Sequence, residues 1–169
     1  MDDGEGHLYI GHAGFGMSIL SLANNTVKNY MNSPWKSNSI PGNDVRCIYK
    51  DTHGNIWIGT EKGLSIFDDK KEEFIVPSHL PQELRNSYVF DIYQTDDDKL
   101  WIGTELNGIF IIDLKRDFLR PLEKEMNIEH IITSDNINYS LANSTVRSIF
   151  QDEFGNIWIG TYGGGVNFI

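Results

Sequence analysis

The sequence predicts an all-β fold, a β-propeller fragment of about three and a half four-stranded blades that form an incomplete ring. Three observations predict it: a repeat centred on tryptophan, a repeat period in the forties of residues, and a composition rich in glycine and aromatic side chains. Glycine favours turns and aromatic residues favour pleated surfaces. The 16 Gly, 4 Trp, 7 Tyr and 9 Phe in 169 residues therefore indicate many short strands.

The repeat occurs three times in full or nearly full form. The copies read VRCIYKDTHGNIWIGTEKGLSIFD from Val45, VFDIYQTDDDKLWIGTELNGIFIID from Val89 and VRSIFQDEFGNIWIGTYGGGVNFI from Val146. A degraded copy opens the chain, with Tyr9 where the others carry Trp. Val precedes the Trp by twelve residues and Ile precedes it by nine, and Gly follows the aromatic residue by two in every copy.

The spacing of the aromatic anchors selects the architecture. Tyr9, Trp57, Trp101 and Trp158 are separated by 48, 44 and 57 residues. A period in the forties holds four short strands with their turns, which is one propeller blade. Helical repeats of this length need amphipathic stretches of ten or more residues, and none lies between the anchors. We expect one propeller domain divided into a partial blade (1–42), a blade (43–85), a blade with an insertion (86–142) and a partial blade (143–169).

The second copy defines the expected elements in order. Its pattern predicts a first strand at 45–49, a turn at 51–54, and further strands at 55–60, 64–68 and 73–76. The residue three places before the aromatic anchor is expected in a left-handed conformation, which Gly adopts freely and Asp tolerates. Side-chain caps of the same turn are expected from an aspartate. The turn residues are Gly6, Gly54, Asp98 and Gly155, and the capping residues are Asp3, Asp51 and Asp152, with Thr95 in the third copy.

The third copy and the two ends depart from the full unit. The stretch from Leu119 to Ala142 contains an insertion of roughly a dozen residues compared with the other copies, which accounts for the longest spacing. The first and last copies each hold three strands, which gives about fourteen strands in all. Because a ring takes about 4–8 whole blades, we expect a fragment of a longer propeller or part of a larger chain.

Composition excludes several functional classes. A net charge of −10 and a pI near 4.8 disfavour nucleic acid and an anionic membrane surface, since both require a basic patch. No apolar run reaches the roughly 18 residues of a membrane-spanning helix, and the N-terminus lacks the features of a signal peptide. The sequence alone therefore indicates either a cytosolic protein or an excised piece, without membrane contact of its own. The single cysteine, Cys47, rules out an internal disulfide framework and a multi-cysteine metal site.

The motif Asp-x-x-Gly-Asn-Ile-Trp-Ile-Gly-Thr, followed by a glycine-rich turn and an apolar strand, resembles the two-component regulator propeller repeat. The second copy matches at Asp51, Gly54, 55–60 and Gly63, and the fourth at Asp152, Gly155, 156–161 and Gly163. The stretch 141–149 also resembles the lead that this family places before each blade. The first and third copies depart at Tyr9, His12, Thr95 and Asp98. The resemblance extends over essentially the whole chain.

This resemblance implies the periplasmic sensor region of a hybrid sensor histidine kinase of Bacteroidetes type, anchored in the inner membrane. Such proteins combine propellers and a β-sandwich with cytoplasmic kinase and receiver parts, and many respond to glycan breakdown products by switching on genes. The implied partners are an oligosaccharide ligand, neighbouring propeller and β-sandwich domains of the same chain, and a second copy in a homodimeric parent. No kinase residue lies in the sequence, so catalysis is not expected in this segment.

The sequence offers no strong catalytic, metal or cofactor motif. The five histidines lack zinc-ligand spacing. The triplet Asp96, Asp97 and Asp98 does not follow the ligand order of an EF-hand and is expected at a hairpin tip. The glycine clusters at 11–16 and 163–165 precede strands rather than the helix that a phosphate loop requires. We therefore expect no metal and no cofactor, while carboxylate pairs, and with them a glycosidase or lyase, stay open.

Candidate ligand residues follow from blade topology. The loop before the first strand and the turn between the second and third strands lie at the same edge of a blade, where loops carry binding residues. The repeated tryptophans are expected between blades rather than in sugar stacking. Trp35, outside the repeat, is either an exposed platform or packed on a sheet edge. The candidates are Asn43, Arg46, Glu61, Tyr88, Asn107, Arg147, Tyr162 and Trp35, flanked by Asp44, Lys62, Asn86, Ser87, Glu105, Asn143 and Ser144.

Three functions remain in view. The first is a non-catalytic sensing segment that responds to glycan-derived oligosaccharides. The second is a structural scaffold or dimerisation module without a ligand site of its own. The third and weakest is a propeller lyase or glycosidase.

Overall fold

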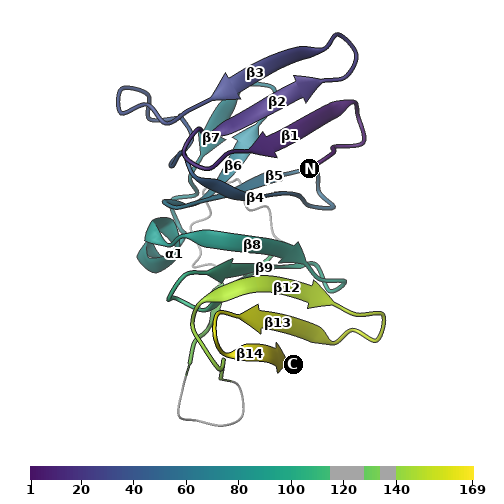
Figure 1. Cartoon of the computed structure of the whole chain (residues 1–169), viewed down its shortest axis with the longest axis vertical. Helices are drawn as coiled ribbons and strands as arrows, with labels where there is room; N and C mark the ends of the chain where they lie inside the picture. Colours follow the sequence, from purple (N-terminus) through teal and green to yellow (C-terminus); the bar gives the residue numbers. More distant parts are fainter. Residues whose placement is uncertain (115–127, 134–139) are drawn as a thin grey trace.

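The protein folds as a row of four antiparallel sheets (Figure 1). The structure, a computed structural model, describes residues 1–114, 128–133 and 140–169. These residues form fourteen strands and one helical turn. The all-β, propeller-like fold predicted from the sequence is confirmed. Most of the predicted insertion, in the stretch from Leu119 to Ala142, lies outside the described residues.

Each sheet is an up-and-down meander in which neighbouring strands are also neighbours in sequence. The first sheet contains β1 (His7–Gly11), β2 (Met17–Ser21) and β3 (Thr26–Tyr30). The second contains β4 (Val45–Lys50), β5 (Ile56–Thr60), β6 (Gly63–Asp68) and β7 (Glu73–Ile75). The third contains β8 (Val89–Gln94), β9 (Lys99–Thr104), β10 (Ile109–Asp113) and β11 (Ile128–Ile131). The fourth contains β12 (Val146–Gln151), β13 (Ile157–Thr161) and β14 (Gly165–Phe168).

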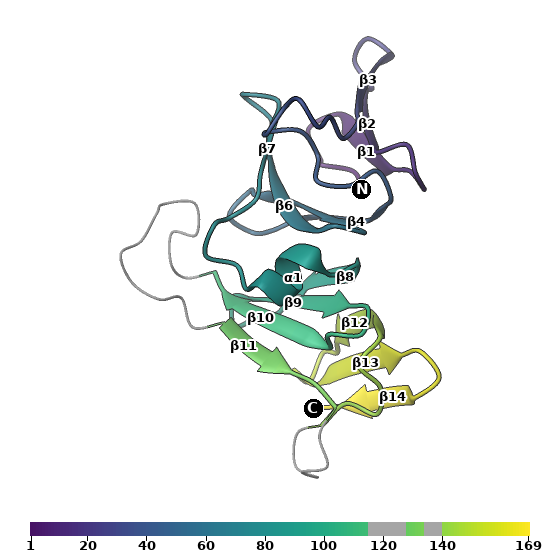
Figure 2. The same cartoon turned by 90° about the vertical axis from the view of Figure 1, so that its left-hand side faces the viewer.

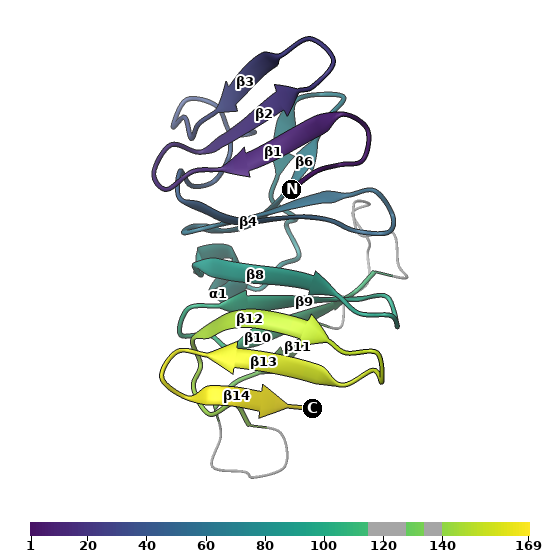
Figure 3. The same cartoon turned by 45° about the vertical axis from the view of Figure 1, so that its right-hand side comes forward.

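The first strands of successive sheets lie next to one another. Figure 3 shows β4, β8 and β12 in succession down the molecule, and β8 contacts both of the others. The helix α1 (Gln82–Asn86) lies in the connection from β7 to β8 and packs on β6 through the buried Leu84 (Figure 2). The sequence analysis missed it, because one turn is too short to show an amphipathic period. In the described part of the chain, no helix has the length and apolar character needed to cross a membrane.

An aspartate organises the hairpin between the first two strands of a sheet. Asp51 Oδ1 accepts hydrogen bonds from the backbone N–H groups of His53 (2.9 Å) and Asn55 (2.8 Å). Asp51 Oδ2 accepts from Asn55 Nδ2 (2.8 Å) and from Trp57 Nε1 (2.7 Å). Asp152 repeats the arrangement with Asn156 and Trp158. The predicted side-chain cap is confirmed, and it also satisfies the indole N–H of the repeat tryptophan.

The third copy lacks this bond. Thr95 replaces the aspartate and accepts no bond from the indole, so Trp101 Nε1 is buried without a hydrogen-bond partner among the described residues. Asp98 takes the glycine position with φ 69°, close to the 85° of Gly54, as the sequence predicted. The turn thus keeps its backbone shape while losing its side-chain acceptor.

Three hydrophobic cores fill the spaces between successive sheets. One surrounds Tyr9 and Phe67, the next Trp57, and the third Trp101. Trp57 is 0% and Trp101 is 8% exposed, which confirms the prediction that these rings pack between blades. Trp158 is 42% exposed, since no described sheet packs on the corresponding face of β12–β14, and for this ring packing between blades stays a prediction.

The repeated glycine and valine form one contact between sheets. A Cβ atom added to the glycine two residues after the aromatic anchor would lie within 2.8 Å of the valine that begins the next sheet. Only hydrogen at this position lets the valine side chain approach so closely. We call each such pair a glycine–valine socket. The three sockets are Gly11 with Val45, Gly59 with Val89, and Gly103 with Val146.

We call the first strand of each sheet its inner strand. A second repeated contact lies at the end of the inner strands β4, β8 and β12 that is opposite to the sockets. The last residue of each inner strand reaches the hairpin turn of the preceding sheet. Lys50 Nζ donates to the Asp3 carbonyl (3.1 Å), the Thr52 N–H donates to Gln94 Oε1 (2.8 Å), and the Asp96 N–H donates to Gln151 Oε1 (2.9 Å). Together the sockets and these bonds fix adjacent sheets at both ends.

Candidate functional site

Three β-bulges mark one edge of the molecule. The strand register shifts between Val45 and Cys47 in β4, at the equivalent place in β8, and again in β12. The residues that the shifts leave out of the register are Arg46, Phe90 and Arg147. Bulges often occur beside functional sites, because the extra residue re-aims its side chain. The same device therefore presents one side chain from each of three sheets at the same edge.

The second and third sheets meet at this edge in a charged cluster. Arg46 Nε donates to the Tyr88 hydroxyl oxygen (2.7 Å), and Arg46 Nη2 donates to Asp44 Oδ2 (3.2 Å). The Tyr88 hydroxyl donates to the same Asp44 oxygen in a short hydrogen bond. The guanidinium carbon lies 5.6 Å from the centre of the Tyr88 ring. A carboxylate, a guanidinium and a phenol thus hold one another in place.

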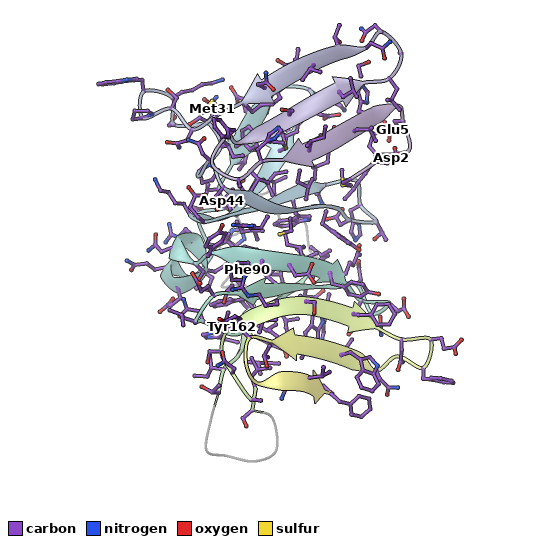
Figure 4. The ribbon with its side chains drawn as sticks, viewed as in Figure 1. Asp2, Glu5, Met31, Asp44, Phe90 and Tyr162 are labelled. Carbon is purple, nitrogen blue, oxygen red and sulfur yellow. The ribbon has the colours of Figure 1, made fainter. Side chains whose placement is uncertain are left out.

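Aromatic and cationic contacts continue the cluster to the fourth sheet. The Tyr88 and Phe90 rings stack with their centres 4.8 Å apart and their planes at 19°. The Arg147 guanidinium carbon lies 3.8 Å from the centre of the Phe90 ring and 5.3 Å from that of Tyr162. Figure 4 shows Asp44, Phe90 and Tyr162 along one edge of the molecule. We call Asp44, Arg46, Tyr88, Phe90, Arg147 and Tyr162 the cation–aromatic ladder.

The electrostatics keep the charged end of the ladder ionised. The hydrogen bond with Tyr88 and the charge of Asp44 raise the pKa of Arg46 above its ordinary value. Burial, followed by the hydrogen bond to Asp44, raises the pKa of Tyr88, so its hydroxyl stays protonated. Asp44 Oδ1 is buried without a partner among the described residues. At the other end Tyr162 is 67% exposed, so its ring is open to solvent.

The structure divides the predicted ligand residues into two groups. It brings Arg46, Tyr88, Arg147 and Tyr162 together in the ladder. Two other candidates at this edge, Asn43 and Glu61, accept hydrogen bonds from the backbone of loops. Glu61 accepts backbone N–H bonds from Asn43 (3.1 Å) and Asp44 (2.9 Å).

Two further candidates lie outside the ladder. Asn107 Nδ2 donates to Ser87 Oγ (2.8 Å), and the Asn107 carbonyl accepts from His130 Nε2 (2.7 Å). Trp35 is 94% exposed in the loop between β3 and β4. The alternative in which Trp35 packs on a sheet edge was wrong, since a packed indole would be largely covered. Its role as a platform remains a prediction.

Sequence reasoning missed Phe90 as a site residue. Phe90 follows a buried valine and has the pattern of an ordinary strand residue. Superposing the copies gives the missing signal, because Arg46, Phe90 and Arg147 occupy the same place directly after the valine. A cationic side chain in two copies and an aromatic one between them predicts stacked contacts once the inner strands are known to be adjacent.

Among the described residues, no three His, Cys, Asp or Glu side chains are grouped to hold a metal ion.

The repeat has a recognised family. A family model described as the two component regulator propeller matches residues 39–62, 83–106 and 140–163. The chain carries two-component regulator propeller repeats. The matched segments each include a glycine–valine position and the start of an inner strand, and so contain the ladder residues. No curated protein matches the chain.

Solved structures contain the same fold as this regulator propeller segment. The extracellular domain of the putative hybrid two component system BT3049 from B. thetaiotaomicron is 51% identical, with a TM-score of 0.80. All of this chain is covered, and it spans 19% of that chain. The corresponding domain of BT4673 from the same organism shares the fold at 22% identity and a TM-score of 0.79, over 100% of this chain and 23% of that one. The ancestral GH74 enzyme AFV00434 shows the fold alone, at 12% identity and a TM-score of 0.62, over 96% of this chain and 22% of that one.

These similarities locate the regulator propeller segment. Identity of 51% over the full length of the chain makes it an extracellular segment of the kind found in hybrid two-component systems. The predicted periplasmic location is confirmed at this level, and the cytosolic alternative is wrong. The chain spans about a fifth of the length of that relative.

Proposed function

We propose that this chain is a non-catalytic part of the ligand-sensing region of a hybrid two-component system, and that the cation–aromatic ladder contributes to its ligand site. The observation that carries the proposal is the ladder itself, which joins three sheets through side chains presented by repeated bulges. Residues that serve only packing do not need an ionised guanidinium at an exposed edge.

The chemistry of the ladder suits an oligosaccharide derived from a glycan. Sugar rings present apolar faces that pack on aromatic rings, and Tyr162 offers such a ring with most of its surface open. Arginine supplies several N–H donors in a fixed geometry, which match sugar hydroxyl or carboxylate oxygens. Among the residues that the structure describes, Arg147 contacts the rings of Phe90 and Tyr162 and makes no hydrogen bond or ion pair, so its N–H groups are available for this role.

The ladder also suggests how ligand binding is transmitted. It crosses from β4 to β8 and then to β12, whose first residues carry the sockets that join adjacent sheets. A ligand that contacts Arg147 and Tyr162 in one arrangement of the sheets, but not in another, shifts the balance between the two. Such a shift at a packed interface is passed to the adjoining domains without catalysis.

Glycoside hydrolysis fits the ladder poorly. That reaction uses two carboxyl groups about 5–9.5 Å apart. Asp44 is the one carboxylate of the ladder, and its Oδ2 is engaged by both Arg46 and Tyr88. This carboxylate oxygen is already occupied by two donors, and a second carboxyl group is not part of the ladder.

A second candidate function, an interface with another domain or a second copy in a homodimeric parent, rests on a different surface. The fourth sheet exposes large apolar side chains on β12–β14 and the turn between β12 and β13. Exposed apolar patches of this kind mark interaction sites. They include Phe150 (57% exposed), Phe154 (81%), Trp158 (42%) and Phe168 (59%).

The two candidates are separated by calorimetry on the intact sensor region, with oligosaccharides as the titrants. We expect Arg147→Ala to weaken binding at least about tenfold, because a charge-assisted donor and its stacking on Phe90 are both lost. Lys70→Ala is the matched control, since it removes one exposed positive charge from the β6–β7 turn. Equal affinities in wild type and Arg147→Ala refute the ladder site. A broad glycan panel without heat refutes the oligosaccharide, and unchanged signalling in Arg46→Ala, Tyr88→Ala and Arg147→Ala favours the scaffold.

A further inference from the structure

A cleft lies between the first and second sheets at the edge away from the ladder. It has a volume of about 340 Å³, at the small end of ligand pockets. Strands of the first sheet form one wall, and the β6–β7 turn forms the other. Figure 4 shows Glu5, from its rim, on the opposite edge of the molecule from Asp44, Phe90 and Tyr162. We call this feature the acidic cleft; its rim carries Glu5, Asp69, Glu72 and Lys28, its buried part includes Asp3, and its floor is formed by Tyr9, Tyr30 and Phe67.

The floor of the acidic cleft is aromatic. The Tyr30 and Phe67 rings meet edge to face with centres 5.1 Å apart, and the Tyr9 and Phe67 rings do so at 6.3 Å. Aromatic rings attract cations through their negative faces. A floor of this kind next to carboxylates favours a positively charged ligand with an apolar portion.

Tyr9 supplies an unused polar group. In the second and fourth sheets the turn aspartate accepts a bond from the indole of the anchor tryptophan. In the first sheet the equivalent Asp3 Oδ2 is bonded to His7 Nδ1 instead (2.9 Å). Tyr9 lines the cleft and is 5% exposed, yet its hydroxyl makes no hydrogen bond to any residue that the structure describes. The hydroxyl is not among the fully buried unpaired atoms of the described residues, so it is open to the cleft and available to a ligand there.

The charges of the acidic cleft are unbalanced. Glu72 pairs with Lys28, and Glu5 with Lys50 at 2.7 Å. Asp69 has no ion pair among the described residues. Burial and, after it, the charges of Asp3 and Asp69 raise the pKa of Tyr9 to about 12. Tyr9 therefore stays a neutral hydroxyl near a carboxylate that forms no ion pair among the described residues, although its charge also acts on Lys50.

The geometry points to a binding site for a small organic cation. We propose that a primary ammonium group binds in the acidic cleft, paired with Asp69 and hydrogen-bonded to the Tyr9 hydroxyl, with its carbon chain over the aromatic floor. A metal ion fits less well, because the described residues contain no group of three His, Cys, Asp or Glu side chains placed to hold one. This site is separate from the ladder and does not depend on it.

The test compares two probes of equal length on the full chain. 1,4-Diaminobutane carries two ammonium groups, and 1,4-butanediol replaces them with neutral hydroxyls. Titrations followed by NMR of the tyrosine rings, in about 0.15 M salt where distant charges are screened, are expected to give saturable shifts at Tyr9 with the diamine and none with the diol. Equal responses to the two probes, or no saturable response to the diamine, overturn the proposal. A calcium titration that shifts Tyr9 more strongly than the diamine overturns it as well.

Two variants locate the site. Asp69→Asn is expected to weaken diamine binding about fivefold, the scale of a partly exposed ion pair, and Tyr9→Phe to weaken it while keeping the ring. Glu153→Gln is the matched control, since it removes one negative charge from the exposed turn between β12 and β13. Equal weakening by Asp69→Asn and Glu153→Gln overturns the proposal, because it indicates attraction by overall charge. Arg147→Ala is expected to leave diamine binding unchanged. Near-UV circular dichroism identifies any variant that loses its packing. Asp69 lies in an exposed turn, so Asp69→Asn still tests the site if Tyr9→Phe unfolds.

Discussion

Replacing Gly103 by alanine tests whether the glycine–valine sockets hold adjacent sheets together. The new Cβ atom would lie 2.8 Å from Val146 Cγ1, 3.3 Å from Val146 Cβ and 3.4 Å from Ile149 Cδ1. Carbon atoms pack at about 3.5–4.0 Å. Val146 is 0% exposed and Ile149 is 5% exposed, so neither side chain has solvent to move into. Because the φ of Gly103 is not in the left-handed region, the cost of the alanine comes from packing rather than from backbone strain.

The expected loss of stability follows from this overlap. Overpacking of a buried site costs about 1–3 kcal/mol, so we expect the free energy of unfolding of Gly103→Ala to fall by that amount. Val146→Ala alone should cost about 2 kcal/mol, because it removes buried methyl groups. In the double variant the alanine at 103 occupies space that the valine has vacated. The two costs should therefore fall short of additivity by about 1 kcal/mol or more.

The measurement is urea unfolding followed by tryptophan fluorescence, for the wild type, both single variants and the double variant. Gly160→Ala is the control at the same repeat position. Its Cβ would meet chiefly the Ser148 hydroxyl oxygen, at 2.5 Å, which rotation about one bond can move away. A loss below about 0.5 kcal/mol in Gly103→Ala, or additive costs in the double variant, would refute the socket as the contact that sets the spacing of the sheets.

Three further outcomes follow from the hairpin turns and inner strands. Trp57→Phe should lower the free energy of unfolding by about 1–3 kcal/mol more than Trp101→Phe does. The reason is that only the Trp57 indole loses a hydrogen bond to an aspartate. Equal losses of the two variants in urea unfolding would contradict this prediction. The Asp152 carboxyl should titrate with a pKa of about 2 by NMR, because N–H donors from Asn156 and Trp158 favour its charged form. Its stabilising effect is therefore present above pH 3.8 and is lost as the pH falls toward 2. A titration midpoint at the ordinary value would refute this prediction. Burial raises the pKa of Asp91 above 3.8, so the folded protein holds that proton more tightly and this residue lowers stability as the pH rises above 3.8. Asp91→Asn should remove that slope, and an unchanged slope would show that another group causes it.

The repeat made most of the fold predictable. Each feature that the copies share, such as the tryptophan with its following glycine and preceding valine, has one structural cause that recurs between every pair of sheets. Asp98 shows how far this extends, because its left-handed φ of 69° followed from its place in the copy rather than from its own preference. Repetition averages out local ambiguity, and so position within the repeat identified the strands.

Features that differ between copies were harder to predict. The ladder depends on Phe90, which reads as an ordinary strand residue until the inner strands are known to be adjacent. In the first copy the turn aspartate Asp3 bonds to His7 rather than to the aromatic anchor, a difference between copies that no pattern reveals. The exposure of Trp158 depends on what covers the fourth sheet rather than on the residue itself. In each case the decisive partner is distant in sequence or specific to one copy.

The glycine–valine sockets give every described pair of adjacent sheets the same kind of contact. Each socket uses the same two residue types, so any unit with valine at its inner edge fits any unit with glycine at the facing position. Stability in such an array is approximately a sum of unit and neighbour terms. Duplicating or deleting one whole unit keeps a glycine–valine socket at every contact between sheets. An ancestral gene could therefore lengthen by copying in steps of one sheet, while the residues at the bulges were free to diverge.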